Sequence, residues 1–179
     1  MQSQKTLLIF FSRAGYNYGI KEKQEIGNTK IVAKIIKELI NCDEYELIPK
    51  KEYPIEYDPC TEVAKKELEQ KARPELKNET LPDLSKYETI LFGFPIWWGT
   101  YPMLFNTFFE KLPKDSFKDK HIGVFCTQEG SRLGSSINDI KSRCIGAKSI
   151  DSGLAITGSL AAQSKQQVIA WLKKLGYTL

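Results

Sequence analysis

The stretch from Thr89 to Thr100 reads TILFGFPIWWGT and decides the fold. Its first part, Thr89 to Phe94, is a short apolar run, which is typical of a strand buried on both faces of a parallel sheet. Pro102 can begin a helix shortly afterwards, so Trp97 and Trp98 lie where a strand meets a helix. Because fully buried tryptophan is infrequent, two adjacent indoles at such a point favour contact with a flat aromatic ligand.

The same strand-then-helix pattern recurs along the chain. Strand-like runs are expected over Thr6–Phe11, Glu44–Ile48, Thr89–Phe94, His121–Cys126 and Ser149–Ile156. Apolar residues at helical spacing predict helices that end near Ile40 and Leu112, and helices over Glu62–Lys71, Ser135–Arg143 and Gln163–Leu175. This alternation predicts an α/β fold in which a five-stranded parallel sheet carries helices on both faces. At 179 residues, the expectation is a single domain over 1–179.

The charge pattern argues against a nucleic-acid partner. The formal net charge is +4 and the pI is near 8.7, yet basic and acidic residues are interspersed, as in Lys65 to Glu69. Such mixing is typical of a solvated surface. No apolar run approaches the ~18 residues that suggest a membrane span, and we find no signal-peptide cleavage pattern. We therefore expect a cytoplasmic protein without membrane insertion.

The cysteines do not indicate a metal site or a nucleophile. Cys42, Cys60, Cys126 and Cys144 are widely spaced, and His121 is the single histidine of the sequence. Cys126 falls inside an apolar strand-like run, which favours a core residue over a reactive thiol. Free thiols suggest a reducing compartment. We expect neither a catalytic side chain nor a metal.

Ligands of open parallel sheets bind beyond the carboxyl ends of the strands. The first loop at this edge contains Ser12 and leads to Gly27, Asn28 and Thr29 at the start of a helix. A helix start suits a phosphate because its first N–H groups lack intrahelical partners and its dipole favours an anion. An ordinary N-cap at Asn28 or Thr29 is the alternative. The glycine motifs that bind nucleoside triphosphates or dinucleotides are absent.

Two further loops end at the same edge. The indoles of Trp97 and Trp98 can stack on a planar heterocycle, although packing of one ring on a helix is the alternative. Gly99 can take a positive φ at low cost and lets the chain turn. The third loop, Thr127 to Gly134, offers hydroxyl, amide and backbone donors for the polar edge of a ring.

Together these motifs resemble those of the flavodoxins. The matching segments are Ser12–Gly15, Gly27–Thr29, Ala72–Leu76, Pro95–Gly99 and Cys126–Ser131. The resemblance implies a flavodoxin-like three-layer sandwich with strand order 2-1-3-4-5. It implies FMN as the cofactor, with its phosphate in the first loop, its ring against the second and further contacts from the third. The candidate cofactor-binding residues are Ser12, Gly27, Asn28, Thr29, Pro95, Ile96, Trp97, Trp98, Gly99, Thr127, Gln128 and Gly130.

Three features depart from the electron-carrying flavodoxins that the chain resembles. Tyr16 to Ile26 is an insertion in the first loop, and it either covers the flavin or extends into solvent. Glu129 and Arg132 stand where the resemblance leads us to expect small residues. The chain is basic, whereas carrier flavodoxins are usually acidic.

The resemblance implies an FMN-binding electron-transfer protein. The alternative is an oxidoreductase that takes hydride from NADH or NADPH and reduces a quinone or similar acceptor. The expected partner is accordingly a redox protein or a small electron acceptor. The sequence indicates no oligomeric state and no particular electron donor.

Overall fold

The computed structural model describes residues 5–19 and 21–179 of the chain. Ile20, which belongs to the predicted insertion, lies outside the described residues. The strands form one parallel sheet of order β2-β1-β3-β4-β5, in which β6 also pairs with β4. Their bounds are β1 Thr6–Phe10, β2 Asp43–Glu46, β3 Thr89–Pro95, β4 His121–Gln128, β5 Ser149–Ile150 and β6 Leu154–Thr157. The predicted fold class and strand order are confirmed.

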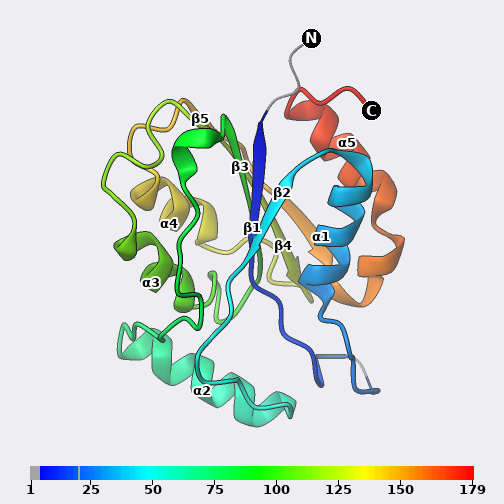
Figure 1. The fold of residues 1–179 in the computed structure, drawn as a ribbon. Coiled ribbons are helices and arrows are strands. Elements are labelled where there is room, and N and C mark those ends of the chain that lie inside the picture. Colours follow the sequence, from blue (N-terminus) through cyan, green and yellow to red (C-terminus); the bar gives the residue numbers. More distant parts are fainter. Residues whose placement is uncertain (1–4, 20) are drawn as a thin grey trace.

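Helices cover both faces of the sheet (Figure 1). One face carries α1 (Asn28–Leu39) and α5 (Lys165–Lys174), and the other carries α3 (Leu104–Lys111) and α4 (Ser136–Arg143). The remaining α-helix, α2 (Tyr57–Glu69), lies beneath the carboxyl ends of the strands (Figure 1). Short 3-10 turns occur at Leu84–Lys86 and Gly158–Gln163. None of the helices in the described ranges is long and apolar enough to cross a membrane.

Alternate residues of the central strands pack into cores on opposite faces of the sheet. On β1, Leu7 and Ile9 belong to the core beneath α3, whereas Leu8 and Phe10 belong to the core beneath α1 and α5. The strand is therefore apolar at every position after Thr6, as its sequence predicted. Cys126 of β4 is fully buried, and its burial raises the pKa of the thiol to about 12.

The prediction of one strand over Ser149–Ile156 is wrong, because the chain leaves the edge of β4 and returns to it. The carboxylate of Asp151 accepts hydrogen bonds from the backbone N–H of Val124, at 2.9 Å, and from Nε1 of Trp171, at 2.6 Å. Gly153 then adopts a φ of +83°, which turns the chain before β6 begins. At this break the backbone N–H of Val124 therefore bonds to a side chain instead of a strand carbonyl.

Two predicted helix bounds also differ. The helix predicted from Glu62 begins at Tyr57, because Pro59 falls in the first helical turn, where its missing N–H has no acceptor to lose. The helix predicted from Gln163 begins at Lys165, after the 3-10 turn.

A test of the packing between β3 and β4 concerns Gly93, because a Cβ there would lie 2.1 Å from Cζ of Phe125. We expect Gly93→Ala to lower the free energy of unfolding by about 2–3 kcal/mol. Phe125→Leu should relieve the clash, so the double variant should lose at least about 1 kcal/mol less than the sum of the single variants. Urea unfolding of the four proteins measures this, and additive losses would contradict the stated packing.

Candidate functional site

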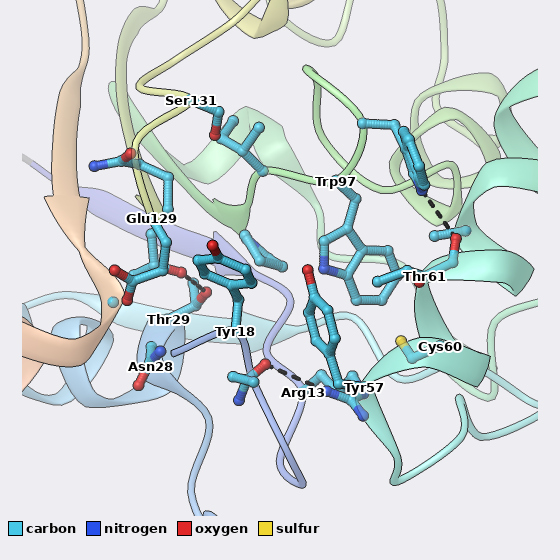
Figure 2. A pocket seen from close by; sticks show the side chains of 18 residues that line it. Arg13, Tyr18, Asn28, Thr29, Tyr57, Cys60, Thr61, Trp97, Glu129 and Ser131 are labelled. Carbon is cyan, nitrogen blue, oxygen red and sulfur yellow. Dashed lines mark hydrogen bonds between the residues drawn. The ribbon is translucent and has the colours of Figure 1, made fainter. Parts of the chain in front are cut away.

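A cavity of about 340 Å³ opens at the carboxyl edge of the sheet (Figure 2). Its volume is in the range of sites for small molecules and cofactors. The loops after β1, β3 and β4 contribute walls, as do the inserted segment and α2. The candidate residues that line it are Asn28, Thr29, Pro95, Ile96, Trp97, Trp98, Thr127 and Gln128.

The other four candidates lie beside the cavity and support its walls. Ser12 Oγ accepts a hydrogen bond from the backbone N–H of Lys30, at 3.0 Å. A Cβ on Gly27 would lie 2.4 Å from that Oγ, so the close approach of the two segments requires glycine. Gly99 and Gly130 occupy turns with φ of +85° and +112°.

The amino end of α1 forms a donor-rich pole of the cavity. The N-cap residue is Gly27, so an N-cap at Asn28 or Thr29 is ruled out, and Ser12, from the start of the same loop, accepts a hydrogen bond from the first turn of the helix. Within the described ranges, the backbone N–H groups of Asn28 and Thr29 donate no hydrogen bond. The Thr29 and Thr127 hydroxyls are 2.8 Å apart and join the first and third loops. Free N–H groups at a helix start suit an anion.

The second pole is aromatic, and each indole is fixed by a different neighbour. Trp97 packs edge-on against Phe11 and Tyr53, with ring centroids 5.4 and 4.8 Å apart. Trp98 donates from Nε1 to the carbonyl of Thr61 on α2, at 2.9 Å, and is 52% exposed. Both rings thus have structural contacts and also line the cavity.

The turn that carries these indoles is tight. Trp97 and Thr100 exchange backbone hydrogen bonds of 2.9 and 3.3 Å. The two residues between them, Trp98 and Gly99, have φ of +52° and +85°, the pattern of a type I′ turn. Positive φ is costly for a bulky residue such as tryptophan, so the contacts of Trp98 must hold it there.

Sequence reasoning missed the residues that the insertion and α2 contribute. Asn17 and Tyr18 of the insertion line the cavity (Figure 2), whereas residues 21–23, Glu25 and Ile26 are exposed to solvent. Tyr57, at the start of α2, also lines it, and its ring centroid is 5.8 Å from that of Tyr18. An aromatic residue beside an amide, Tyr18 beside Asn17, in an otherwise polar insertion was the feature of the sequence that could have indicated ligand contact.

Arg13 holds the insertion and α2 together. Its guanidinium donates to the carbonyls of Pro54, Ile55 and Glu56, just before α2. It also donates to the carbonyl of Tyr16, at 2.8 Å. The backbone N–H of Tyr16 also donates to the carbonyl of Ile55, at 2.9 Å. Arg13, a donor-only side chain, adds further bonds to carbonyls of both segments.

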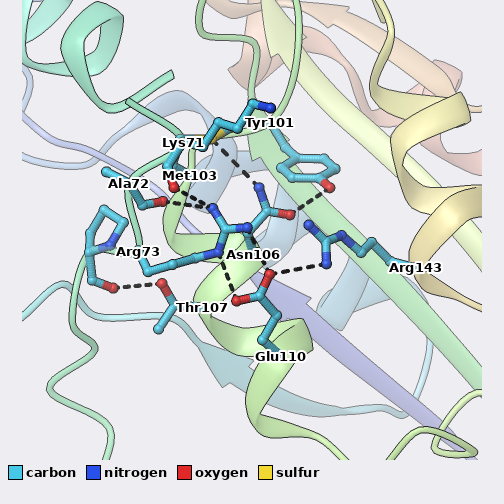
Figure 3. A network of polar contacts seen from close by, with 10 residues as sticks. Lys71, Ala72, Arg73, Tyr101, Met103, Asn106, Thr107, Glu110 and Arg143 are labelled. Carbon is cyan, nitrogen blue, oxygen red and sulfur yellow. Dashed lines mark hydrogen bonds and ion pairs between the residues drawn. The ribbon is translucent and has the colours of Figure 1, made fainter. Parts of the chain in front are cut away.

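A second arginine fixes the other end of α2 (Figure 3). Arg73, just beyond the helix, donates to both carboxylate oxygens of Glu110 on α3, at 2.8 and 2.7 Å. It also donates to the carbonyls of Lys71 and Ala72. Arg143 of α4 reaches the same carboxylate at 3.2 Å. These contacts give the Ala72–Leu76 motif a structural role away from the cavity.

Two titratable side chains of the cavity wall, Cys60 and Tyr57, are buried to different extents. Burial raises the pKa of the Cys60 thiol, against the opposing effect of Arg13, and burial also raises the pKa of the Tyr57 phenol. Both groups are therefore neutral at pH 7, and a neutral buried thiol is a poor nucleophile. In residues 5–19 and 21–179 no cluster of histidine, cysteine and carboxylate side chains is suited to a metal ion.

Comparison with known proteins identifies the family. The model of a flavodoxin family, described as Flavodoxin, matches residues 21–175, so the chain belongs to that family. A search of curated proteins gives no match.

Solved structures share the fold. A protein of Bacteroides eggerthii, provisionally described as a flavoprotein, is 22% identical with a TM-score of 0.72, over 98% of this chain and 100% of that chain. A protein of Bacteroides uniformis with the same description is 26% identical with a TM-score of 0.67, over 94% and 99%. A flavoprotein of Lactobacillus acidophilus, solved in complex with FMN, is 17% identical with a TM-score of 0.64, over 95% and 99%.

A test of the Arg13 contacts uses Arg13→Gln, which removes most of the donors to the two segments. We expect amide hydrogen exchange in 16–19, 21–26 and 54–61 to become roughly ten- to a hundredfold faster, which corresponds to about 1–3 kcal/mol of local stability. Arg132→Gln is the matched control, because Arg132 is exposed in the third loop and its guanidinium makes no hydrogen bond within the described ranges. Unchanged exchange in Arg13→Gln would show that these contacts do not hold the segments.

Proposed function

We propose that the protein is an FMN-binding electron-transfer flavoprotein. The observation that carries this proposal is the pairing of two poles in one cavity: free N–H groups at the start of α1 and the indoles of the second loop. FMN has the matching polarity, an anionic phosphate at one end and a flat aromatic ring at the other. Membership of the flavodoxin family supports the same cofactor.

The residues present fit such a cofactor. Asn28 and Thr29 would hold the phosphate with backbone N–H groups, and Ile96 and Trp97 would contact the ring. Gln128 Oε1 accepts from the backbone N–H groups of Gly130 and Arg132, which leaves its Nε2 group as a donor at the cavity. That donor suits a carbonyl on the polar edge of the ring.

FMN supplies the redox chemistry when bound, because its ring system accepts and releases one or two electrons. Trp97, Tyr18 and Tyr57 would exclude water from the ring, and Asn28 and Thr29 would hold the phosphate at the opposite pole of the cavity. No side chain of the site is required as a nucleophile or general base.

A first test titrates apoprotein with FMN and compares the wild type with Trp98→Gly. The variant gains a residue suited to positive φ but loses the hydrogen bond from Nε1 to Thr61. Because each effect is about 1 kcal/mol and they oppose each other, we expect nearly unchanged thermal stability. FMN should bind about two- to tenfold more weakly, because one aromatic contact is lost. Quenching of flavin fluorescence measures the Kd.

The control for this titration is Ile145→Ala, which removes an exposed apolar side chain from the turn after α4. Its Kd for FMN should equal that of the wild type. Absence of FMN binding by the wild-type apoprotein, or equal affinity of Trp98→Gly, would count against the proposed site.

The second candidate function is an oxidoreductase that uses NADH or NADPH. The observation that favours it is the cover over the cavity: Tyr18, Tyr57 and Trp98 stand around the opening and are 60%, 37% and 52% exposed. A flat ring can stack on such aromatic side chains, whereas a protein partner would meet the cover first.

The two candidates differ in their reaction with NADPH. As an electron carrier, the FMN-loaded protein should keep its visible colour when NADPH is added without oxygen, and lose it only after a reductase is supplied. Rapid bleaching by NADPH alone would instead identify the oxidoreductase. Stopped-flow absorbance at the flavin band makes the distinction, with free FMN as the control.

A further inference from the structure

Side-chain amides of the inserted segment form a relay of hydrogen bonds from Arg13 to Asn28 at the start of α1. Arg13 Nη1 donates to Oδ1 of Asn17 at 3.2 Å, and Nδ2 of Asn17 donates to Oε1 of Gln24 at 2.6 Å. Nε2 of Gln24 then donates to Oδ1 of Asn28 at 2.8 Å. Backbone bonds of 2.8 and 3.0 Å between Gly15 and Gln24 hold the middle of this relay in place.

The relay has a fixed direction because a guanidinium can only donate hydrogen bonds. Asn17 must therefore turn its oxygen toward Arg13 and its amino group toward Gln24. The same constraint passes along the relay and turns the oxygen of Asn28 toward Gln24. Nδ2 of Asn28 is left as the end of the relay, and it donates no hydrogen bond within the described ranges.

The free amino group of Asn28 lies against Gly158, another residue of the cavity wall, where a Cβ would be only 2.5 Å from Nδ2. It thus adds a side-chain donor to the free backbone N–H groups of Asn28 and Thr29. The carboxylate of Glu129 stands near the same point, with Oε1 3.1 Å from that Cβ position. An anion bound here would lie near the negative charge of Glu129. A hydrogen-bond donor that the relay holds in position would offset part of this repulsion.

We propose that the insertion makes the site selective for a phosphorylated flavin, with Gln24 as the positioning residue that orients Asn28. This inference rests on the proposed function, since it assumes that a flavin occupies the cavity. The Gln24 side chain contacts the phosphate end, through Asn28, whereas the second loop, α2 and Tyr18 form the ring end. The backbone bonds between Gly15 and Gln24 hold the insertion and do not depend on that side chain. Loss of the relay should therefore change the preference for FMN over riboflavin, which lacks the phosphate.

The experiment compares wild-type protein with Gln24→Met, a variant of similar side-chain length that neither donates nor accepts at this position. The matched control is Gln166→Met on α5, where the glutamine is exposed and its side chain makes no hydrogen bond within the described ranges. Apoproteins are titrated with FMN and, separately, with riboflavin, and their thermal unfolding midpoints are recorded.

We expect the wild type and Gln166→Met to bind FMN more tightly than riboflavin. In Gln24→Met the Kd for FMN should rise by about five- to tenfold, which corresponds to the loss of about one typical hydrogen bond, with the Kd for riboflavin and the unfolding midpoint nearly unchanged. Equal weakening for both flavins, or no weakening for either, would overturn the inference. So would a wild type that binds riboflavin as tightly as FMN, although the proposed flavin site would then stand. A wild type that binds neither flavin rejects the proposed function itself.

Discussion

Parallel pairing of three neighbouring strands is the constraint on which the site depends. In the observed register, Phe10 pairs with Gly93, and Pro95 pairs with Thr127. The chain therefore leaves β1, β3 and β4 at the same edge, and the loops that follow must meet there. Burial of apolar side chains on both faces of the sheet fixes this register, since a shift by one residue would exchange the two cores.

A sheet edge alone gives an open groove, and two additional segments turn it into a cavity. The insertion in the first loop and α2 both lie at this edge rather than on a face of the sheet (Figure 1). The insertion and the residues just before α2 share a backbone hydrogen bond from Tyr16 to Ile55, and the Arg13 guanidinium adds side-chain bonds to both segments. The same side chain sets the direction of the amide relay. A single arginine thus connects the cover of the cavity to the donor-rich pole at α1.

The sequence was sufficient for the architecture and for most of the cavity wall. Runs such as Thr89–Phe94 are short, apolar and followed by helical spacing, so local pattern and tertiary structure agree there. The motif residues Asn28, Thr29 and Trp97 were predicted as site residues from their places at strand and helix ends, and they line one cavity. Their role toward FMN stays a prediction.

What the sequence could not provide depends on contacts between distant residues. Asn17 and Gln24 read as polar insertion residues, and only their places relative to Arg13 and Asn28 give them a role. The position of α2 could not be predicted, because the arginine contacts at its two ends join residues far apart in the sequence and produce no local sequence pattern. The break before β6 likewise depends on Asp151 reaching Val124 on another strand.

The most direct measurement of this account is a crystal structure of the protein grown with FMN. The account predicts a flavin enclosed by the three loops, with its phosphate within hydrogen-bond distance of Asn28 and Thr29 and its ring against Trp97. A flavin bound on another face of the molecule, or one whose phosphate points out of the cavity past Tyr18, would contradict it.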